Sequence, residues 1–410
     1  MMATIVFSYI TLVILTKIYL NQANAQAIKE HRLKVPPFFD QWLKQDEHTK
    51  ASDYTLAKLK FSLVELIFSS ALTLLFLLYG YQAIDQTITH TLMTSETYRG
   101  LIFFGVLGLL QMIFALPFSL YFNFVLEERF GFNKMTIGTF FEDKLKGLVL
   151  ALVLATPLLI LILEFIQFFE RDWWWIAASL VVAFQFFLLW VYPSLIAPLF
   201  NKFTPLEDEK IKSELKGLLK KIDLHFDSFY VMDASKRSGH GNAYFTGFGK
   251  KRRVVFFDTL LNQLSPNEVM AVMAHELGHL KKNHIKKSFA ISIVSTYGLF
   301  LLYWYVMKQP WLYSLFEVRP SSYMGLNLMF TLSSFAFFFL GPLTSIFSRK
   351  NEYEADTFAV HHSSGEDLIS ALVGLYKENS SCVVQAKAYS FFYNSHPSAR
   401  ERIDAIQKQL

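Results

Sequence analysis

Two histidines and a glutamate in one short stretch have a spacing that can hold a metal ion. The stretch reads His275-Glu276-Leu277-Gly278-His279. On a helix, residues four apart share a face, so the imidazoles of His275 and His279 can converge on one ion while Glu276 reaches a water molecule beside it. A pair of solvated surface histidines is the alternative interpretation.

The residues before this motif predict the helix that carries it. Ser265 suits the N-cap position, Pro266 the first helical position and Glu268 the third, where it completes a capping box. We therefore expect a helix to begin after Ser265 and to include both histidines.

Two histidines leave a catalytic zinc site one protein ligand short. Cys382 is the single cysteine, so a thiolate cluster cannot complete the site. Glu352 and Asp356 follow the last apolar stretch and lie one turn apart on the same helical face. Glu352 can complete a two-His, one-Glu site, and Asp356 can accept the free ring N–H of a ligating histidine. The alternative is a solvated acidic helix end.

The composition is that of a membrane protein. Of 410 residues, 53% are hydrophobic, 17% aromatic and 18% charged, whereas an ordinary soluble domain has roughly 25% charged residues. High hydrophobicity also excludes intrinsic disorder. The net charge of +5 does not predict nucleic-acid binding, because cytoplasmic loops of membrane proteins normally carry excess Lys and Arg.

Seven apolar stretches are long enough, or nearly so, to cross a bilayer. They are Ile5–Leu20, Phe61–Ile84, Gly100–Phe122, Leu145–Leu163, Trp174–Tyr192, Phe289–Val306 and Tyr323–Phe347. The short loops on one side carry ten Lys and Arg and those on the other side carry four, which predicts an N-terminus outside and a C-terminus in the cytoplasm. The first stretch and Ala23-Asn24-Ala25 resemble a signal peptide, but a basic start is missing, so we expect it to be retained.

Two charged stretches complete the predicted organisation. Both are expected in the cytoplasm, where they can pack together as one catalytic domain. The predicted order is membrane helices one to five with their loops in 1–192, the first part of the catalytic domain in 193–288, membrane helices six and seven in 289–347, and the second part of the catalytic domain in 348–410.

The site is expected near the cytoplasmic membrane surface. If the motif helix continues into the sixth apolar stretch, His279 lies about 15 Å before Phe289 along the helix axis. Glu352 lies about 8 Å beyond Phe347 by the same rise.

A small sheet is predicted beside the motif helix, with an edge that can hold an extended peptide by backbone pairing. The predicted strands are Asp227–Met232, Asn242–Phe248 and Arg253–Phe257, the last two joined by a turn at Gly249-Lys250-Lys251. The candidate substrate-binding residues are Asn242, Ala243 and Tyr244. An ordinary structural hairpin is the alternative.

Other polar residues receive weaker predictions. His284 lies off the ligand face of the motif helix and is expected, like His361 and His362, to be solvated or to cap a helix. Polar residues inside apolar stretches usually face a bundle interior or a cavity, or bond to a neighbouring helix. They are Glu65, Gln111 and Gln185.

HExxH followed by Glu-Tyr-x-Ala-Asp resembles the gluzincin metallopeptidases of membranes. Further stretches narrow the resemblance to the type I CAAX prenyl endopeptidase family, and together they cover nearly the whole chain. These stretches are Ala51–Tyr54, Glu127–Lys134, Ser235–Ser238, Gly241–Phe245, and Asn394–Pro397 with Arg402.

The resemblance implies roles for individual residues. The residues implied to bind one zinc ion are His275, His279 and Glu352. Glu276 is implied to act as the general base, and Asp356 to orient a ligating histidine. His396 and Arg402 are implied to lie near the reacting carbonyl.

The fold expected from this resemblance is an all-α polytopic membrane protein. Seven transmembrane helices would form a barrel around a water-filled chamber, with a cytoplasmic α+β zinc-peptidase domain that carries a small β-sheet. The implied activity is removal of the C-terminal tripeptide from prenylated CaaX proteins by a monomer in the bilayer. The membrane would be a bacterial inner membrane or the endoplasmic reticulum, according to the source.

Three alternatives stay open. A membrane-protein quality-control protease would have no prenyl specificity. An inactive relative would only bind membrane polypeptides. A transporter with an accidental motif would be expected to have inverted repeats or paired broken helices, and the sequence has neither feature.

Overall fold

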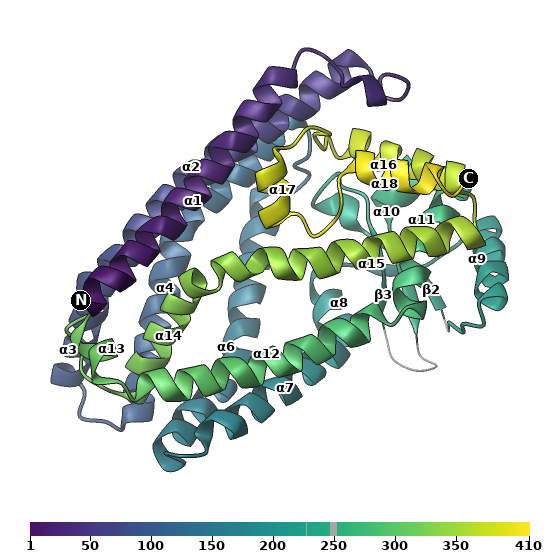
Figure 1. The fold of residues 1–410 in the computed structure, drawn as a ribbon. Helices are drawn as coiled ribbons and strands as arrows, with labels where there is room; N and C mark the ends of the chain where they lie inside the picture. The colour runs from purple at the N-terminus through teal and green to yellow at the C-terminus, as the bar shows by residue number, and fades with distance from the viewer. Residues whose placement is uncertain (227, 247–251) are drawn as a thin grey trace.

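The computed structural model describes residues 1–226, 228–246 and 252–410. Figure 1 shows long helices that surround a central region, with a smaller sheet-containing part at one end. The N-terminus lies at the opposite end from the C-terminus. Most of the described chain is helical.

Long helices make up the first part of the chain and return later. They and their short connecting helices are α1 (Met2–His31), α2 (Gln45–Leu75), α3 (Tyr81–Thr91), α4 (Glu96–Tyr121), α5 (Glu128–Phe130), α6 (Ile137–Phe168), α7 (Trp173–Val191), α8 (Ala197–Phe200), α12 (His284–Met307), α13 (Pro310–Ser314), α14 (Ser322–Ala336) and α15 (Gly341–His362). Turns of π-helix interrupt three of the runs, at η2 (Phe76–Gly80), η3 (Phe122–Glu127) and η4 (Tyr192–Ile196).

Most of the remaining elements form the sheet-containing part. They are β1 (Phe203–Pro205), α9 (Glu209–Lys221), β2 (Ser228–Met232), β3 (Ala243–Thr246), β4 (Arg253–Phe257), α10 (Asp258–Gln263), α11 (Pro266–Lys281), α16 (Gly365–Glu378) and α18 (Ala399–Gln407). A further short helix, α17 (Lys387–Tyr393), contacts α1 and α15 instead. Single turns of 3-10 helix occur at η1 (Pro37–Phe39), η5 (Ala234–Lys236) and η6 (Phe338–Leu340).

Six helical runs in the described residues are long and apolar enough to cross a membrane, and the bent pair of α14 and α15 makes a seventh if it is one span. The last predicted span, Tyr323–Phe347, covers most of α14 and the start of α15. The chain bends by 45° at η6, between these two helices. The bend lets α15 run away from the membrane helices and across to the sheet-containing part (Figure 1).

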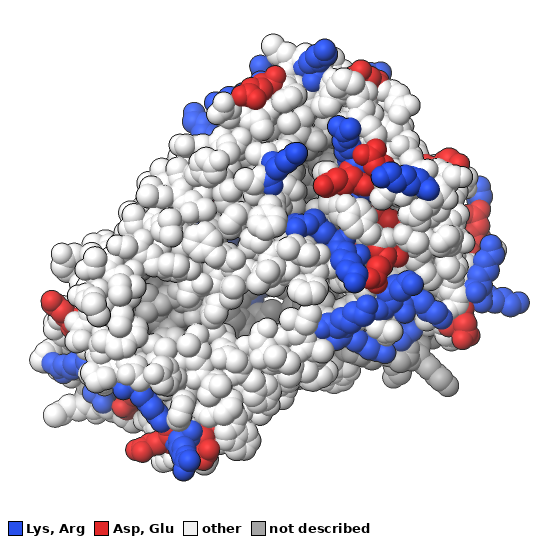
Figure 2. Space-filling view, viewed as in Figure 1, with Lys and Arg blue, Asp and Glu red and all other residues white. Residues whose placement is uncertain are grey.

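The surface has an apolar, almost uncharged band between two charged ends, as expected for a protein that spans a bilayer. Large apolar side chains of the long helices are exposed, for example Val153 (62%), Trp190 (65%) and Val294 (73%). Figure 2 shows Lys, Arg, Asp and Glu gathered at two ends of the molecule, with an almost uncharged band between them. Lipid would cover this band, because exposed apolar area of that extent is not stable in water.

The sheet has four strands in the order β1-β2-β4-β3. β2 and β4 are parallel, whereas β1 and β3 pair antiparallel at the two edges. The prediction omitted β1, whose three residues carry no alternating pattern. Asp227, Phe248 and the predicted turn at Gly249-Lys250-Lys251 lie outside the described residues.

Two large hydrophobic cores hold the molecule together. One packs the membrane helices, and the other packs the sheet against α9, α11, α16 and α18. Val35, Phe39 and Leu43, in the connection between α1 and α2, also belong to the second core. The sheet-containing part is therefore completed by a segment that precedes it by more than 150 residues.

Candidate metal centre

Helix α11 carries both histidines of the motif and begins as the sequence predicts. The Ser265 hydroxyl accepts a hydrogen bond from the Glu268 N–H, and the Glu268 carboxylate accepts one from the Ser265 N–H, 2.8 Å away. The helix does not continue into the sixth span, so the predicted distance of about 15 Å between His279 and Phe289, which assumed one continuous helix, does not apply. α11 ends at Lys281, and Asn283 adopts a left-handed conformation (φ 58°) before α12 begins.

Three donor groups converge between α11 and α15. The Nε2 atoms of His275 and His279 lie 3.2 Å apart. Glu352 places its Oε2 3.4 Å from Nε2 of His275 and its Oε1 3.3 Å from Nε2 of His279. Ligand atoms at about 2.0–2.2 Å from a tetrahedral zinc ion lie about 3.3–3.6 Å from one another. The separations therefore fit a zinc ion at their centre.

The hydrogen bonds around these donors also fit a cation. Nδ1 of His275 donates to Oδ1 of Asp356 over 2.8 Å, which leaves a lone pair on Nε2. Glu352 is buried, and its Oε2 has no hydrogen-bond partner among the described residues. Buried acceptors that face one another without a donor repel unless a positive charge lies between them.

Arg402 forms a bidentate ion pair with Asp356. The guanidinium donates to both carboxylate oxygens, from Nε over 2.9 Å and from Nη2 over 2.6 Å. Both side chains are buried. Arg402 also reaches the donor residues, since its Nη1 lies 3.8 Å from Oε2 of Glu352 and its Nη2 lies 3.3 Å from Nδ1 of His275. The implied contact of Arg402 with a reacting carbonyl stays a prediction.

Burial opposes a charge on His275, but the hydrogen bond to Asp356 and the nearby Glu352 carboxylate outweigh it and raise the pKa of His275 to about 9. The site thus stabilises a positive charge next to His275 even without a metal ion. A divalent cation at the same place would benefit from the same two carboxylates.

A cavity of about 680 Å³ opens onto the donors. Glu276 lines it beside His279, and burial raises the pKa of the Glu276 carboxyl. His396 lines it as well, with an exposed ring whose Nε2 lies 3.4 Å from Oε1 of Glu352. Tyr244 of β3 contributes to the wall. A carboxyl group and an imidazole therefore share one cavity with the candidate metal-binding groups.

The edge strand β3 borders this cavity. The Asn242 carbonyl accepts a hydrogen bond from the Phe257 N–H, so the backbone groups of Ala243 and Phe245 point away from β4. The side-chain oxygen of Asn242 accepts a hydrogen bond from the Ala243 N–H over 2.8 Å. The groups left for pairing are the Ala243 carbonyl and both backbone groups of Phe245.

Nearly the whole chain matches two descriptions of one group of peptidases. Residues 24–202 match "CAAX prenyl protease N-terminal, five membrane helices", and residues 205–410 match "Peptidase family M48". The chain belongs to peptidase family M48. CAAX prenyl protease 1 of Saccharomyces cerevisiae is 33% identical over 95% of this chain and 91% of its own length. The human CAAX prenyl protease 1 homolog is 31% identical over 91% of this chain and 88% of its own length.

The crystal structure of S. mikatae Ste24p superposes with a TM-score of 0.93 at 32% identity and covers 98% of both chains. These similarities confirm the predicted family, the helical membrane fold and the metallopeptidase class. The transporter interpretation is wrong.

His284 is a residue of this M48 peptidase whose environment was predicted wrongly. It is 3% exposed, and its Nδ1 lies 3.0 Å from Nδ1 of His279. Its Nε2 lies 3.1 Å from Oε2 of Glu354. If Nε2 of His279 keeps its lone pair for a metal, its Nδ1 donates to His284, which in turn donates to Glu354. The left-handed turn at Asn283 creates this arrangement, and a continuous helical wheel does not predict it. By contrast, His362 donates to the Phe358 carbonyl near the end of α15, as predicted.

The chain of hydrogen bonds predicts a graded effect of substitution at His284. His284→Leu removes the acceptor for His279 and should weaken zinc binding roughly 10–100-fold. His284→Asn keeps an acceptor oxygen near the position of Nδ1 and should retain more affinity. Competition with a chromophoric chelator measures both variants. Equal affinities for the Asn and Leu variants would contradict this arrangement.

Close packing at Gly278 yields a second prediction. A Cβ at Gly278 would lie 3.0 Å from the Ala355 Cα and 3.1 Å from the Ala355 carbonyl oxygen. Gly278→Ala must therefore push α15 away and displace Glu352, so zinc affinity should fall roughly tenfold or more. Gly217→Ala is the matched control, because nothing lies within 4 Å of its added Cβ. Unchanged affinity in a folded Gly278→Ala variant would refute the effect.

Proposed function

We propose that this chain is a zinc endopeptidase that cleaves prenylated CaaX proteins near the cytoplasmic membrane surface. The observation that carries the proposal is the convergence of His275, His279 and Glu352 beside Glu276 in one cavity. The printed names of the yeast and human relatives support the substrate class.

A zinc ion held by these three donors would supply Lewis-acid activation of a water molecule and of the scissile carbonyl. Glu276 accepts the proton of the water and passes it to the leaving amine, a role that its raised pKa favours. His396 donates an N–H to the carbonyl oxygen as negative charge develops there.

Asp356 and Arg402 have positioning roles in this proposal. Asp356 fixes the tautomer of His275 so that Nε2 keeps its lone pair. Arg402 neutralises Asp356 and fixes its orientation with two hydrogen bonds. The position of His396 in the cavity makes it the better candidate of the two residues for contact with substrate.

An extended substrate would pair with β3. The Ala243 carbonyl and the backbone of Phe245 would bond to the peptide, and such pairing orients the scissile bond without requiring a particular sequence. Asn242 would fix the start of this edge by holding the Ala243 N–H. The ring of Tyr244 would contact a substrate side chain from the cavity wall.

One chain supplies every group of this site, so we propose that the monomer is active. Residues 193–288 and 348–410 would act as one catalytic unit, joined by their shared core. The excess of Lys and Arg in alternate loops supports a cytoplasmic position for that unit and an outside position for the N-terminus.

The central experiment combines a variant with two substrates. Glu276→Gln should keep its zinc and lose about 10²–10⁴-fold in kcat, because only the proton acceptor is removed. Chelation should abolish wild-type activity, and added zinc should restore it. Wild-type rates on a farnesylated CaaX peptide and on its unprenylated twin measure prenyl dependence.

The outcomes separate the parts of the proposal. A zinc-free protein as purified, or a Glu276→Gln variant as fast as wild type, would exclude the mechanism. Equal rates on the two peptides would remove prenyl recognition and favour a quality-control protease. Zinc binding without cleavage of either peptide would indicate an inactive relative.

Cysteine labelling tests the orientation. In sealed vesicles, an impermeant maleimide should modify Lys216→Cys, on the exposed surface of α9, from the cytoplasmic side alone. Met93→Cys, in the loop before α4, should react from the opposite side alone. Native Cys382 is buried, so the background should be low. The reverse pattern would invert the topology.

A further inference from the structure

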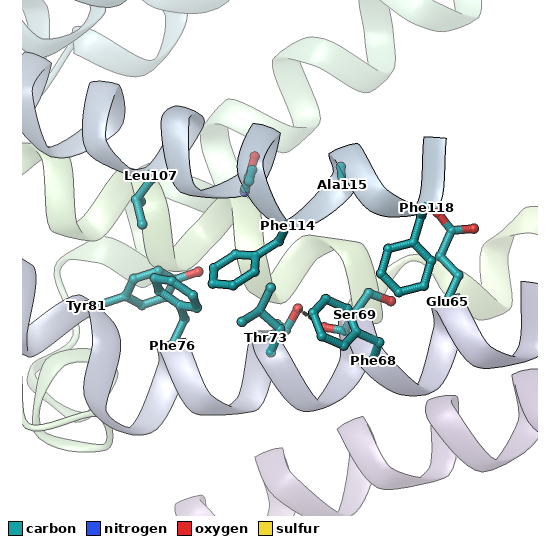
Figure 3. Close-up of a pocket in the computed structure, with 12 residues that line it drawn as sticks. Glu65, Phe68, Ser69, Thr73, Phe76, Tyr81, Leu107, Phe114, Ala115 and Phe118 are labelled. Carbon is teal, nitrogen blue, oxygen red and sulfur yellow. Dashed lines mark hydrogen bonds between the residues drawn. The ribbon is translucent and has the colours of Figure 1, made fainter. Parts of the chain in front are cut away.

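An elongated apolar pocket of about 290 Å³ lies between α2 and α4, within the membrane helices. Figure 3 shows aromatic rings of both helices meeting across it, with Glu65 and Phe118 at one end and Tyr81 with Leu107 at the other. From Glu65 of α2 to Phe76 at the start of η2 the lining covers eleven helical steps, or about 16 Å. The shape suits a narrow, extended apolar chain.

The pocket lies on a different face of α2 from the one that lipid covers. Its lining residues on α2 recur at intervals of three or four, so they share one face. They include Glu65, Ser69 and Thr73. Residues that project from the opposite face are large, apolar and exposed, namely Val64, Ile67, Leu75 and Leu78. A carboxylate on the lipid side would be costly. The pocket therefore opens toward the interior of the helix ring.

Local backbone features shape the far end of the pocket. Phe76 begins the π-helical turn η2, which re-aims the residues that follow it. A Cβ at Gly80 would lie 2.6 Å from the Phe76 ring, so the missing side chain makes room for that ring. The Tyr81 hydroxyl is bonded to Thr331 over 2.9 Å. The end of the pocket is thus formed by specific packing.

A second, more polar pocket shares part of its lining with the first and extends to a segment next to the metal cavity. Both pockets share Glu65 and Phe118, and the second continues past Asn123 to Asn394. Asn394 is two residues from His396, which lines the metal cavity. Residues 394–396 therefore contribute to the lining of both the second pocket and the metal cavity.

Resting on the proposed function, we propose that the α2–α4 pocket binds the isoprenoid chain of the substrate while its peptide lies at the metal donors. A prenyl chain that leaves lipid for a polar cavity exposes apolar carbon to water, at a free-energy cost that grows with each CH₂. The pocket offsets this cost. Its aromatic walls, including Phe68 and Phe118 with ring centroids 5.0 Å apart, favour packing against an unsaturated chain.

Filling the pocket tests the assignment. Ser69 and Ala115 are small lining residues on opposite walls, so Ser69→Phe and Ala115→Phe should each occupy the space of the chain. We expect kcat/KM for a farnesylated peptide to fall roughly tenfold or more, with no change for its unprenylated twin. Ala71→Phe is the matched control, because Ala71 is exposed on the lipid side of α2 and should leave both rates unchanged.

Photolabelling identifies the occupant. A peptide whose farnesyl chain ends in a diazirine should label α2 or α4 at the pocket, and an unmodified farnesylated peptide should displace it. Labelling by a diazirine phospholipid that the farnesylated peptide does not displace would assign the pocket to bilayer lipid and overturn the proposal. Equal losses on both peptides, or no loss in either filled variant, would also overturn it. If wild type cleaves neither peptide but labelling persists, the proposed function fails and the binding site stands.

Discussion

The site depends on the distance between two helices that meet with almost no side chain between them. Gly278 of α11 packs against the backbone of Ala355 of α15, and a single methyl group would not fit without movement. One helix carries two donor histidines, and the other carries Glu352 one turn before the contact. A shift of about 1 Å would spoil separations that match a tetrahedral ion. The bend at η6 aims α15 at this contact, so the membrane helices serve the same geometry.

Charge balance is the second constraint on this contact. Glu352 and Asp356 are both buried, and Arg402 is the cation that binds Asp356 directly. Buried carboxylates without compensation are strongly destabilising. The remaining negative charge is stabilised by a proton on His275 or by a bound divalent ion. The buried carboxylates of Glu352 and Asp356 therefore favour a cation at this site. The hydrogen bond from Nδ1 of His275 to Asp356 leaves the lone pair of His275 on Nε2, where it can face that cation.

Local patterns predicted the parts of this site that depend on neighbours in sequence. Ser265 and Glu268 predicted the start of α11, and its histidines four residues apart share a face as a helix requires. Local sequence patterns could not predict the features that depend on packing between distant segments. A left-handed residue at Asn283 brings His284 back against His279, and helical periodicity cannot foresee such a turn. The break between α14 and α15, the short strand β1, and the packing of residues 35–43 into the second core depend on contacts between distant segments. The roles of Asn242, Ala243 and Tyr244 stay predictions, although their strand does lie at an edge.

The core that packs the sheet with residues 35–43 also affects the order in which the chain can fold during synthesis. Val35, Phe39 and Leu43 leave the ribosome early, whereas Ile403 and Ile406, which are fully buried with them, are synthesised several hundred residues later. At typical elongation rates of about 5–20 residues per second, this interval lasts on the order of a minute. Arg402, which clamps Asp356, arrives with the late segment. A ribosome-bound intermediate therefore contains His275 and His279 before Asp356 and Arg402 have been synthesised. Proteolytic activity is delayed until the membrane helices have already been inserted.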